Sequence, residues 1–330
     1  MQNFWRHDSI AAPLSKIAYA DSNHFIGATN RHPAYDIIKS VDGGSTWQEI
    51  LQLRRKENTA IFAMASDIAH PTRNSVFVIV DSVRNETSQE GKFNFQASTL
   101  FFSRDGGLTW TQKYWGNFQS EEERSFKNII MNDSLNGVMI QMWSDSNKTN
   151  RLAPVLYTKD GGNSWTEVSL PESDVVIRRH PHEDHPVLAS HEAGKWIVKV
   201  FNYVTESDEL WKTVNYGKTW EQLSFPLEKL QKVIFKNEMA GYSLGYKGGY
   251  NAIAMFAKTV DGGKSWTTHE FPAPNTFRAP YRDIDFIDEM NGIIASYDRI
   301  WRTIDGGISW QEEYVGNVDT ASAGSYINQM

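Results

Sequence analysis

Short apolar runs, separated by polar and glycine-containing turns, recur over almost the whole chain. Six segments share a pattern of Ile or Val with an aromatic residue, His or Met at the end: residues 16–19, 67–70, 128–131, 177–180, 232–235 and 283–286. Alternation with a period of two is typical of β-strands with one buried face. The longest apolar runs, residues 60–65 and 76–80, are far shorter than the ~20 residues of a membrane helix. The pattern predicts an all-β protein without a membrane span.

Each of these first strands is followed by three more predicted strands. A polar turn leads to an apolar second strand at residues 25–28, 76–80, 138–142, 196–200, 242–244 and 293–296. The third strand is expected at residues 36–39, 100–102, 155–157, 210–212, 255–258 and 300–302. A fourth strand begins at a tryptophan in every unit. Four antiparallel strands repeated six times are typical of a β-propeller.

One octapeptide joins the third and fourth strands of each unit. Its first copy is Ser40-Val41-Asp42-Gly43-Gly44-Ser45-Thr46-Trp47, and the others occupy residues 103–110, 158–165, 213–220, 259–266 and 303–310. Asp-Gly between strands is a strong hairpin signal, because glycine supplies the positive φ of the turn. The aspartate can accept backbone hydrogen bonds, and the tryptophan contributes apolar area to the core. We therefore assign structural roles to Asp42, Asp105, Asp160, Asn215, Asp261 and Asp305, and to Trp47, Trp110, Trp165, Trp220, Trp266 and Trp310. In the fourth copy Tyr216 replaces the first glycine, which predicts a turn that is looser or differently shaped.

These repeats define one predicted domain over residues 1–330. Its blades span approximately residues 14–52, 58–115, 124–170, 174–225, 230–270 and 280–316, and the termini are expected to close the ring. A seventh blade, pieced together from residues 1–13 and 317–330, is the alternative. The surplus residues are expected in loops at 84–98, 144–153 and 205–209, where binding functions often lie.

The octapeptide resembles the Asp-box, or bacterial neuraminidase repeat. This motif marks sialidases, xyloglucanases, sortilin-type luminal domains and the photosystem II stability/assembly factor family, and the resemblance covers residues 14–316. The stretch from Ile284 to Gly307 resembles most closely the repeat unit of the assembly-factor family. That resemblance implies a non-catalytic scaffold that docks protein partners, peripheral turns that are not catalytic, and an extracellular or periplasmic location. The alternative that it implies is a secreted sialidase-like glycoside hydrolase or a carbohydrate-binding propeller.

A second, weaker resemblance supplies the catalytic candidates. Phe277-Arg278-Ala279-Pro280 is similar to the arginine-containing element of sialidases, which use arginines to hold a carboxylate. Arg282 and Asp283 follow within five residues. Arg278, Arg282 and Asp283 are therefore candidates for a catalytic cluster, and a salt-bridged loop is the other interpretation.

Histidines are concentrated between residues 180 and 191. His180, His182 and His185, with the neighbouring acids, are candidate ligands of a divalent metal, because imidazole and carboxylate both suit Zn²⁺ or Mn²⁺. The two nearby prolines favour a solvated loop instead. Arg178 and Arg179 are candidates for binding a carboxylate-bearing ligand or partner.

Tryptophans outside the octapeptides offer a further possibility, carbohydrate stacking. Trp211 and Trp301 lie on third strands, where packing between blades is expected. Trp143 lies beside the surplus residues of the third unit and is the candidate exposed ring for a glycan or a partner.

Composition narrows the function classes. The formal net charge is −7, which argues against sequence-independent nucleic-acid binding. Cysteine is absent, so disulfides, thiolate catalysis and sulfur-ligated metals are excluded. Residues 1–8 lack the basic and apolar regions of a signal peptide. We expect no cofactor, and a protein or a glycan as the partner.

Overall fold

The computed structural model describes residues 14–29, 34–54, 61–88, 91–114, 122–145, 155–170, 175–176, 188–202, 204–205, 207–224, 227–248, 253–271, 283–295 and 299–315. The chain divides into two compact units, Met1–Ser125 and Phe126–Met330. Every regular element in the described ranges is a β-strand. Among these residues no helix is long and apolar enough to cross a bilayer.

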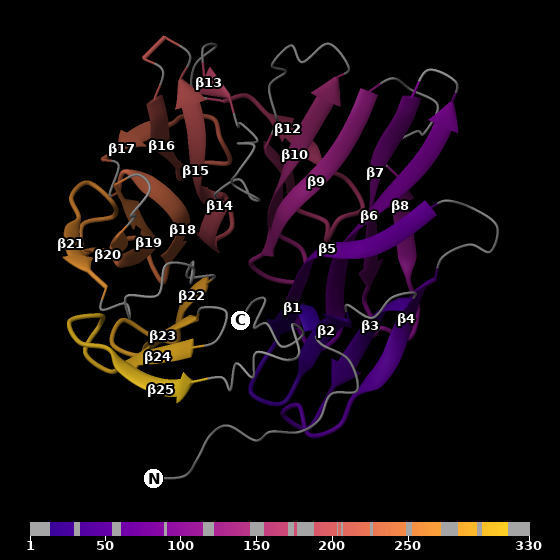
Figure 1. The fold of residues 1–330 in the computed structure, drawn as a ribbon, viewed down its shortest axis with the longest axis horizontal. Helices are drawn as coiled ribbons and strands as arrows, with labels where there is room; N and C mark the ends of the chain where they lie inside the picture. The colour runs from indigo at the N-terminus through magenta and orange to yellow at the C-terminus, as the bar shows by residue number, and fades with distance from the viewer. Residues whose placement is uncertain are drawn as a thin grey trace. The chain divides into compact units, whose positions relative to one another are not determined.

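The strands form six four-stranded antiparallel blades, which Figure 1 distinguishes by colour in chain order. The first blade contains β1 (Leu14–Tyr19), β2 (Phe25–Thr29), β3 (Ala34–Ser40) and β4 (Gln48–Arg54). The second contains β5 (Ile61–Thr72), β6 (Ser75–Ser88), β7 (Gly91–Ser103) and β8 (Thr111–Tyr114). The third contains β9 (Glu122–Met131), β10 (Gly137–Asp145), β11 (Val155–Thr158) and β12 (Thr166–Val168).

The remaining blades follow the same order. In the fourth blade the first-strand position is shared by two segments that both pair with the second strand, β13 (Val175–Val176) and β14 (Leu188–Glu192). They are followed by β15 (Lys195–Asn202), β16 (Ser207–Thr213) and β17 (Glu221–Leu223). The fifth contains β18 (Lys229–Phe235), β19 (Gly241–Lys247), β20 (Ile253–Thr259) and β21 (Thr267–Glu270). The sixth contains β22 (Asp283–Phe286), β23 (Gly292–Ala295), β24 (Arg299–Thr303) and β25 (Gln311–Val315). The chain is thus a six-bladed β-propeller, as the repeats predicted.

Apolar side chains from consecutive blades meet in continuous clusters inside each unit. In the first unit, residues of β2 and β3 pack against residues of β5 and β6, including Ile26, Ile37, Ile68 and Val78. In the second unit, Tyr242 and Phe256 of the fifth blade pack against Phe286 of the sixth. The rings of Tyr242 and Phe286 are stacked with centroids 3.6 Å apart. Within each unit, burial of apolar side chains between sheets therefore stabilises the packing of consecutive blades.

Two sequence expectations about strand position are corrected. Residues 84–98 were expected to form a loop, but most continue β6 and β7 as a long hairpin that pairs Arg84 with Phe95 and Ser88 with Gly91. The first strand of the fourth blade was expected at residues 177–180, which lie outside the described residues. Its position beside β15 is instead filled by β13 and β14. On β14, Ser190 pairs with Trp196 and Glu192 with Lys195, so His191 lies at a register shift between them.

Candidate functional site

The octapeptide of the first blade is closed by its own polar side chains. One carboxylate oxygen of Asp42 accepts the Thr46 N–H at 2.9 Å and the Ser40 hydroxyl at 2.8 Å, and the other accepts the Thr46 hydroxyl at 2.6 Å. The Ser40 oxygen also accepts the N–H of Gly44 at 2.8 Å. Both oxygens of the carboxylate are thus engaged inside the turn, which fixes its shape.

The same bonds recur in the other aspartate copies. The backbone N–H four residues on reaches the carboxylate of Asp105, Asp160 and Asp261 at 2.9 Å, and that of Asp305 at 3.0 Å. The hydroxyl of the same Ser or Thr is the main cause that lowers the pKa of Asp42, Asp261 and Asp305 to about 2, followed by this N–H. These carboxyls are ionised at neutral pH and unsuited to proton donation.

The fourth octapeptide keeps this shape despite its different residues. The Thr219 N–H donates to the Asn215 side-chain oxygen at 2.9 Å, and the Asn215 amide donates to the Thr219 hydroxyl at 2.8 Å. Tyr216 adopts a φ of +60°, the region that its glycine counterparts occupy. The expectation of a looser or differently shaped fourth turn is therefore wrong: Tyr216 adopts the unfavourable backbone conformation of the glycines instead.

Each octapeptide is bonded to the turn between the first and second strands of its own blade. The first glycine N–H donates to a carbonyl of that turn in five blades: Gly43 to Asn23 at 3.0 Å, Gly106 to Asn74 and Gly161 to Leu135 at 2.8 Å, Gly262 to Met239 at 2.9 Å, and Gly306 to Met290 at 2.8 Å. In the fourth blade, the Tyr216 N–H donates to Gly194 at 3.0 Å. These bonds hold the two turns at one end of every blade together.

Lysines connect an octapeptide to the blade before it. The ammonium of Lys39 donates to the carbonyl of Gly106 at 2.9 Å, that of Lys212 to Gly262 at 3.3 Å, and that of Lys258 to Gly306 at 3.2 Å. Each lysine precedes the octapeptide of its own blade by one residue. We call these three residues the bridging lysines.

The bridging lysines have fixed partners on the second strand. Lys39 pairs with Ile26, Lys212 with Ile197 and Lys258 with Tyr242. Ile26, Ile197 and Tyr242 are all buried. The corresponding pair of the sixth blade is Arg302 and Ile293, in which the arginine is exposed and the isoleucine is only partly buried.

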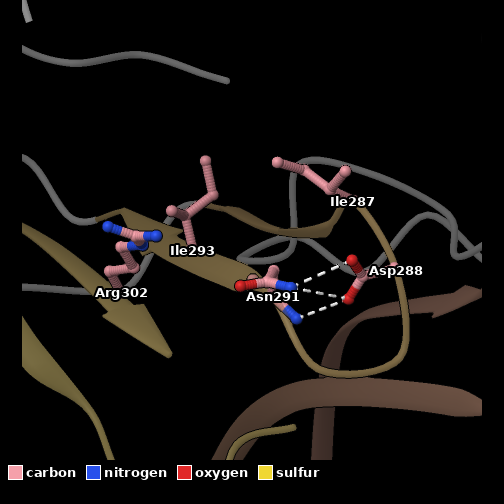
Figure 2. Close-up of a pocket in the computed structure, with 6 residues that line it drawn as sticks. Ile287, Asp288, Asn291, Ile293 and Arg302 are labelled. Atoms are coloured by element: carbon pink, nitrogen blue, oxygen red, sulfur yellow. Dashed lines mark hydrogen bonds between the residues drawn. The ribbon is translucent and has the colours of Figure 1, made fainter. Parts of the chain in front are cut away.

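This last pair belongs to a pocket of about 210 Å³ lined by Ile287, Asp288, Asn291, Gly292, Ile293 and Arg302. In Figure 2, Arg302 and Ile293 project from neighbouring strands, and Ile287 lies on the turn beyond Ile293. The carboxylate of Asp288 accepts the N–H groups of Met290 and Asn291 at 2.8 and 2.7 Å, and also the Asn291 amide. These bonds, that of Met290 first, lower the pKa of Asp288. The pocket therefore combines aliphatic walls with a guanidinium, and its carboxylate is already engaged.

The structure places only one of the three catalytic candidates. Asp283 begins β22, is 3% exposed, and forms an ion pair with Lys232 of β18. Its carboxylate also accepts the N–H of Ile284 at 2.8 Å. Arg278 and Arg282 lie outside the described residues. The described part of this group is thus a buried ion pair between two first strands.

The other candidates lie mostly outside the described residues as well. These are Arg178, Arg179, His180, His182 and His185, while Trp143 is described only as part of the β10 backbone. Within the described ranges, no group of three His, Asp or Glu residues is placed to hold a metal ion. Trp211 and Trp301 are buried in clusters between blades, as their third-strand positions predicted.

Sequence reasoning missed the pocket of the sixth blade. Its signal was the residue before each octapeptide, which is lysine in three blades and arginine in the sixth. That pattern became informative only when the register showed which apolar residue lies opposite each cation. His70 was also missed: it is 4% exposed, its Nδ1 bonds to the Ser75 carbonyl at 3.0 Å, and its Nε2 has no hydrogen-bond partner among the described residues.

No family model matches the chain. A curated protein that it resembles is the uncharacterized protein YCR100C of Saccharomyces cerevisiae, 24% identical over 201 residues. That match covers 57% of this chain and 59% of the relative, so the chain spans less than two thirds of the length of the protein it matches.

Solved structures resemble the chain in fold. YCF48 from Cyanidioschyzon merolae superposes with a TM-score of 0.52 at 14% identity, over 91% of this chain and 84% of that one. A structure of YCF48 bound to D1 peptide gives 0.52 at 15% identity, over 92% and 83%. The Hadza microbial sialidase Hz136 gives 0.53 at 13% identity, over 90% and 64%. The chain is a β-propeller of the kind found in YCF48 and sialidases, and at these identities the likeness concerns the fold alone.

Proposed function

We propose that the chain is a non-catalytic β-propeller of the Asp-box kind that binds a protein partner and acts as an assembly scaffold. The observation that carries this proposal is the hydrogen bonding of the aspartates in the repeated octapeptides. The carboxylates of the five octapeptide aspartates are engaged in closing their own turns. They are therefore parts of the framework, and no proton transfer is assigned to them.

The accessible surface of the sixth blade supports the same proposal. Ile287, Ile304 and Ile308 are exposed by 82, 65 and 78% on its two turns. Of these, Ile287 lines a pocket together with Ile293 and Arg302. Exposed aliphatic side chains are suited to a protein surface, since they contribute burial on contact, and arginine contributes directed hydrogen bonds. The fold similarity to YCF48, which has been solved bound to D1 peptide, is consistent with peptide recognition.

Glycoside hydrolysis or glycan binding is the alternative, and the similarity to a sialidase fold supports it. A hydrolase needs two carboxyl groups roughly 5–10 Å apart at the scissile bond. Asp283 was the acid singled out for that role, but its pairing with Lys232 favours a structural ion pair.

Two measurements on the full chain test the proposal. The first is hydrolysis of a panel of sialosides and β-glucans, for which we expect no turnover above the background. Turnover that is abolished by Asp283→Asn but kept by Asp261→Asn would overturn the proposal. The second measurement crosslinks partners in the source cells and then titrates each purified candidate against the chain and its Ile304→Asp variant. We expect a protein whose affinity falls at least tenfold in the variant. Retention of glycans alone would support the alternative.

A further inference from the structure

Three positions at the octapeptide end of a blade are exposed in one blade after another, and we call them the end positions. Two are the second and the sixth residue of the octapeptide, which are exposed in all six blades. The third is the turn residue whose carbonyl accepts the octapeptide N–H, and it is exposed in every blade but the fourth, where it is Gly194. In the fifth blade, which packs against the sixth, Val260 is 68% exposed and Met239 is 54% exposed. Exposure of the end positions therefore does not require that the side of the blade is uncovered.

The sixth blade has an apolar residue at all three end positions. These residues are Met290, Ile304 and Ile308, which are exposed by 49, 65 and 78%. Each of the other five blades has a polar residue, a charged residue or a glycine at one or more end positions: Asn23 and Ser45 in the first, Asn74 and Arg104 in the second, Lys159 and Asn163 in the third, Gly194 and Lys218 in the fourth, and Lys264 in the fifth. Exposed apolar side chains that are gathered in this way are typical of a protein-binding surface.

Hydrogen bonds hold the two turns of this surface together. The Gly306 N–H donates to the Met290 carbonyl at 2.8 Å, so Met290 lies beside the octapeptide that carries Ile304 and Ile308. Within the octapeptide, the Asp305 carboxylate accepts the Ser309 N–H at 3.0 Å and the Ser309 hydroxyl at 2.5 Å. A surface whose backbone is already fixed loses little conformational entropy when a partner binds.

The charge around the three apolar residues is negative. Residues 287–291 and 303–310, which form the two turns, contain three acids and no Lys, Arg or His. The matching residues of the fifth blade, 236–240 and 259–266, contain two acids and two lysines. Lys258 bonds to the sixth octapeptide just as Lys212 bonds to the fifth, so the difference between the blades persists. The pKa of Asp305 is about 2, so this acid is ionised at neutral pH. The apolar side chains therefore lie in a field that attracts cations.

We propose that Met290, Ile304 and Ile308 form the docking patch for a segment of a partner protein in which aliphatic residues are flanked by Lys or Arg. The aliphatic side chains of that segment cover the patch, and its cations interact with the surrounding carboxylates. A second copy of this chain would bring two patches of the same charge together, which is unfavourable. This inference rests on the proposed protein-binding function and specifies the chemistry of the segment that the partner contributes.

The test uses the full chain and three short fluorescein-labelled peptides. The first alternates leucine and lysine, the second leucine and glutamate, and the third serine and lysine. We expect saturable binding of the leucine–lysine peptide by fluorescence anisotropy, with an affinity that falls as the salt concentration rises. The other two peptides should bind at least about tenfold more weakly, because each lacks either the cations or the aliphatic side chains.

Variants locate the binding surface. Ile308→Lys introduces the residue that the fourth and fifth blades have at this position, so its melting temperature should be unchanged. Its affinity for the leucine–lysine peptide should fall at least about tenfold. Glu289→Gln, whose side-chain oxygen can still accept the Asn237 amide, should weaken binding by about threefold. The matched control is Leu108→Lys, which changes a residue that is also exposed and occupies the same octapeptide position in the second blade, and it should bind like the unchanged chain.

Several results would overturn the inference. They are absence of binding by the unchanged chain, equal binding of the leucine–lysine and leucine–glutamate peptides, and equal losses in Ile308→Lys and Leu108→Lys. Co-sedimentation with phosphatidylcholine vesicles that is lost in Ile308→Lys would assign the patch to a membrane instead. A dimer that dissociates in Ile308→Lys would assign it to a second copy. A protein partner that the leucine–lysine peptide does not displace would refute the patch and leave the proposed function intact. Glycan turnover would remove that function without changing peptide binding.

Discussion

The ammonium of Lys159 lies 3.7 Å from the centroid of the Tyr216 ring. The same ring contacts Tyr157, with centroids 5.0 Å apart, and Trp196, at 5.8 Å. Tyr157 occupies the position that a bridging lysine holds in three other blades. Between the third and fourth blades, an aromatic and cation–π contact therefore replaces the usual bond from lysine to a glycine carbonyl.

The first prediction separates two contributions of Tyr216 to stability: the cost of its positive φ and the stabilisation from its aromatic contacts. Tyr216→Ala and Tyr216→Gly both remove the aromatic contacts, but only glycine tolerates a φ of +60° without cost. Both variants should be less stable than the unchanged chain, and the glycine variant should be the more stable of the two by about 1 kcal/mol. Urea denaturation followed by tryptophan fluorescence measures both values. Equal stability of the variants would contradict a strained turn.

The second prediction concerns the octapeptide acids. Asp261→Asn should lower the free energy of unfolding only slightly, because Asn215 makes equivalent bonds in the fourth blade. Asp261→Ala should lower the free energy of unfolding more than Asp261→Asn does, since it removes the acceptor that ties the Ser265 N–H and hydroxyl into the turn. Chemical denaturation at neutral pH measures the difference. An asparagine variant as unstable as the alanine variant would show that the negative charge itself is required.

The third prediction is loss of stability in acid. The pKa of Asp42, Asp261 and Asp305 is about 2 in the folded chain, below the ordinary value of 3.8. A depressed carboxyl pKa contributes stability that is fully present above the unfolded value. That contribution should be lost as the pH falls from about 4 to about 2. Thermal melting across this range in the unchanged chain and in Asp261→Asn provides the measurement, and the variant should have a shallower slope.

The fourth prediction concerns two histidines on first strands, His70 on β5 and His191 on β14. Burial lowers the pKa of His70 and His191 from 6.5, and the Nε2 atoms of both lack a hydrogen-bond partner among the described residues. Below pH 6.5 the unfolded chain takes up protons before the folded one, so stability should decrease there. His70→Met, which introduces the residue found at the equivalent Met131, should weaken this dependence. Melting temperatures between pH 7.5 and 5 measure it, and identical profiles would refute the assignment.

The fifth prediction uses two glycines with the same backbone conformation. Gly307 and Gly44 have φ values of +91° and +89°. A Cβ atom at Gly307 would approach the Phe256 ring to 2.3 Å, whereas at Gly44 its nearest contact would be Trp47 at 3.8 Å. Gly307→Ala should therefore be less stable than Gly44→Ala by at least about 1 kcal/mol, since overpacking adds to the shared conformational cost. Denaturation curves for the two variants test this comparison.

Much of the fold could be predicted from local signals that recur. The octapeptide is such a signal, because its own side chains determine the turn, and in all six blades seven residues separate the third strand from the fourth. The long hairpin of β6 and β7 could not be inferred in the same way. Its distal residues, from Arg84 onward, are rich in polar side chains, and their strand pairing is revealed only by the register.

The candidate site was less accessible to sequence reasoning. Residues 177–180, to which we assigned the first strand of the fourth blade, lie outside the described residues. The strand at Leu188–Glu192 was not identified, because it lacks the Ile or Val of the first-strand pattern. Tyr216 suggested a different turn, because its compensating partners Lys159 and Tyr157 lie more than fifty residues away in sequence. Nothing in the sequence singles out Arg302, because its equivalence to the bridging lysines is visible only from the strand register.

Each octapeptide is bonded to the turn between the first and second strands of its blade, so these two connections lie at the same end of the blade. We call this the constant end, because its connections are alike in all blades, and the opposite end the variable end. Seven-residue connections with nearly identical hydrogen bonds lie at the constant end. The connections between second and third strands, at the other end, range from two residues in the second blade to nine in the third. New recognition loops can accordingly be added at the variable end without altering the repeat. For protein engineering, the connection at residues 146–154 is therefore a suitable place to graft a foreign epitope. An insertion within residues 259–266 would instead break the hydrogen bonds that close the octapeptide turn and hold it to the first turn of the fifth blade.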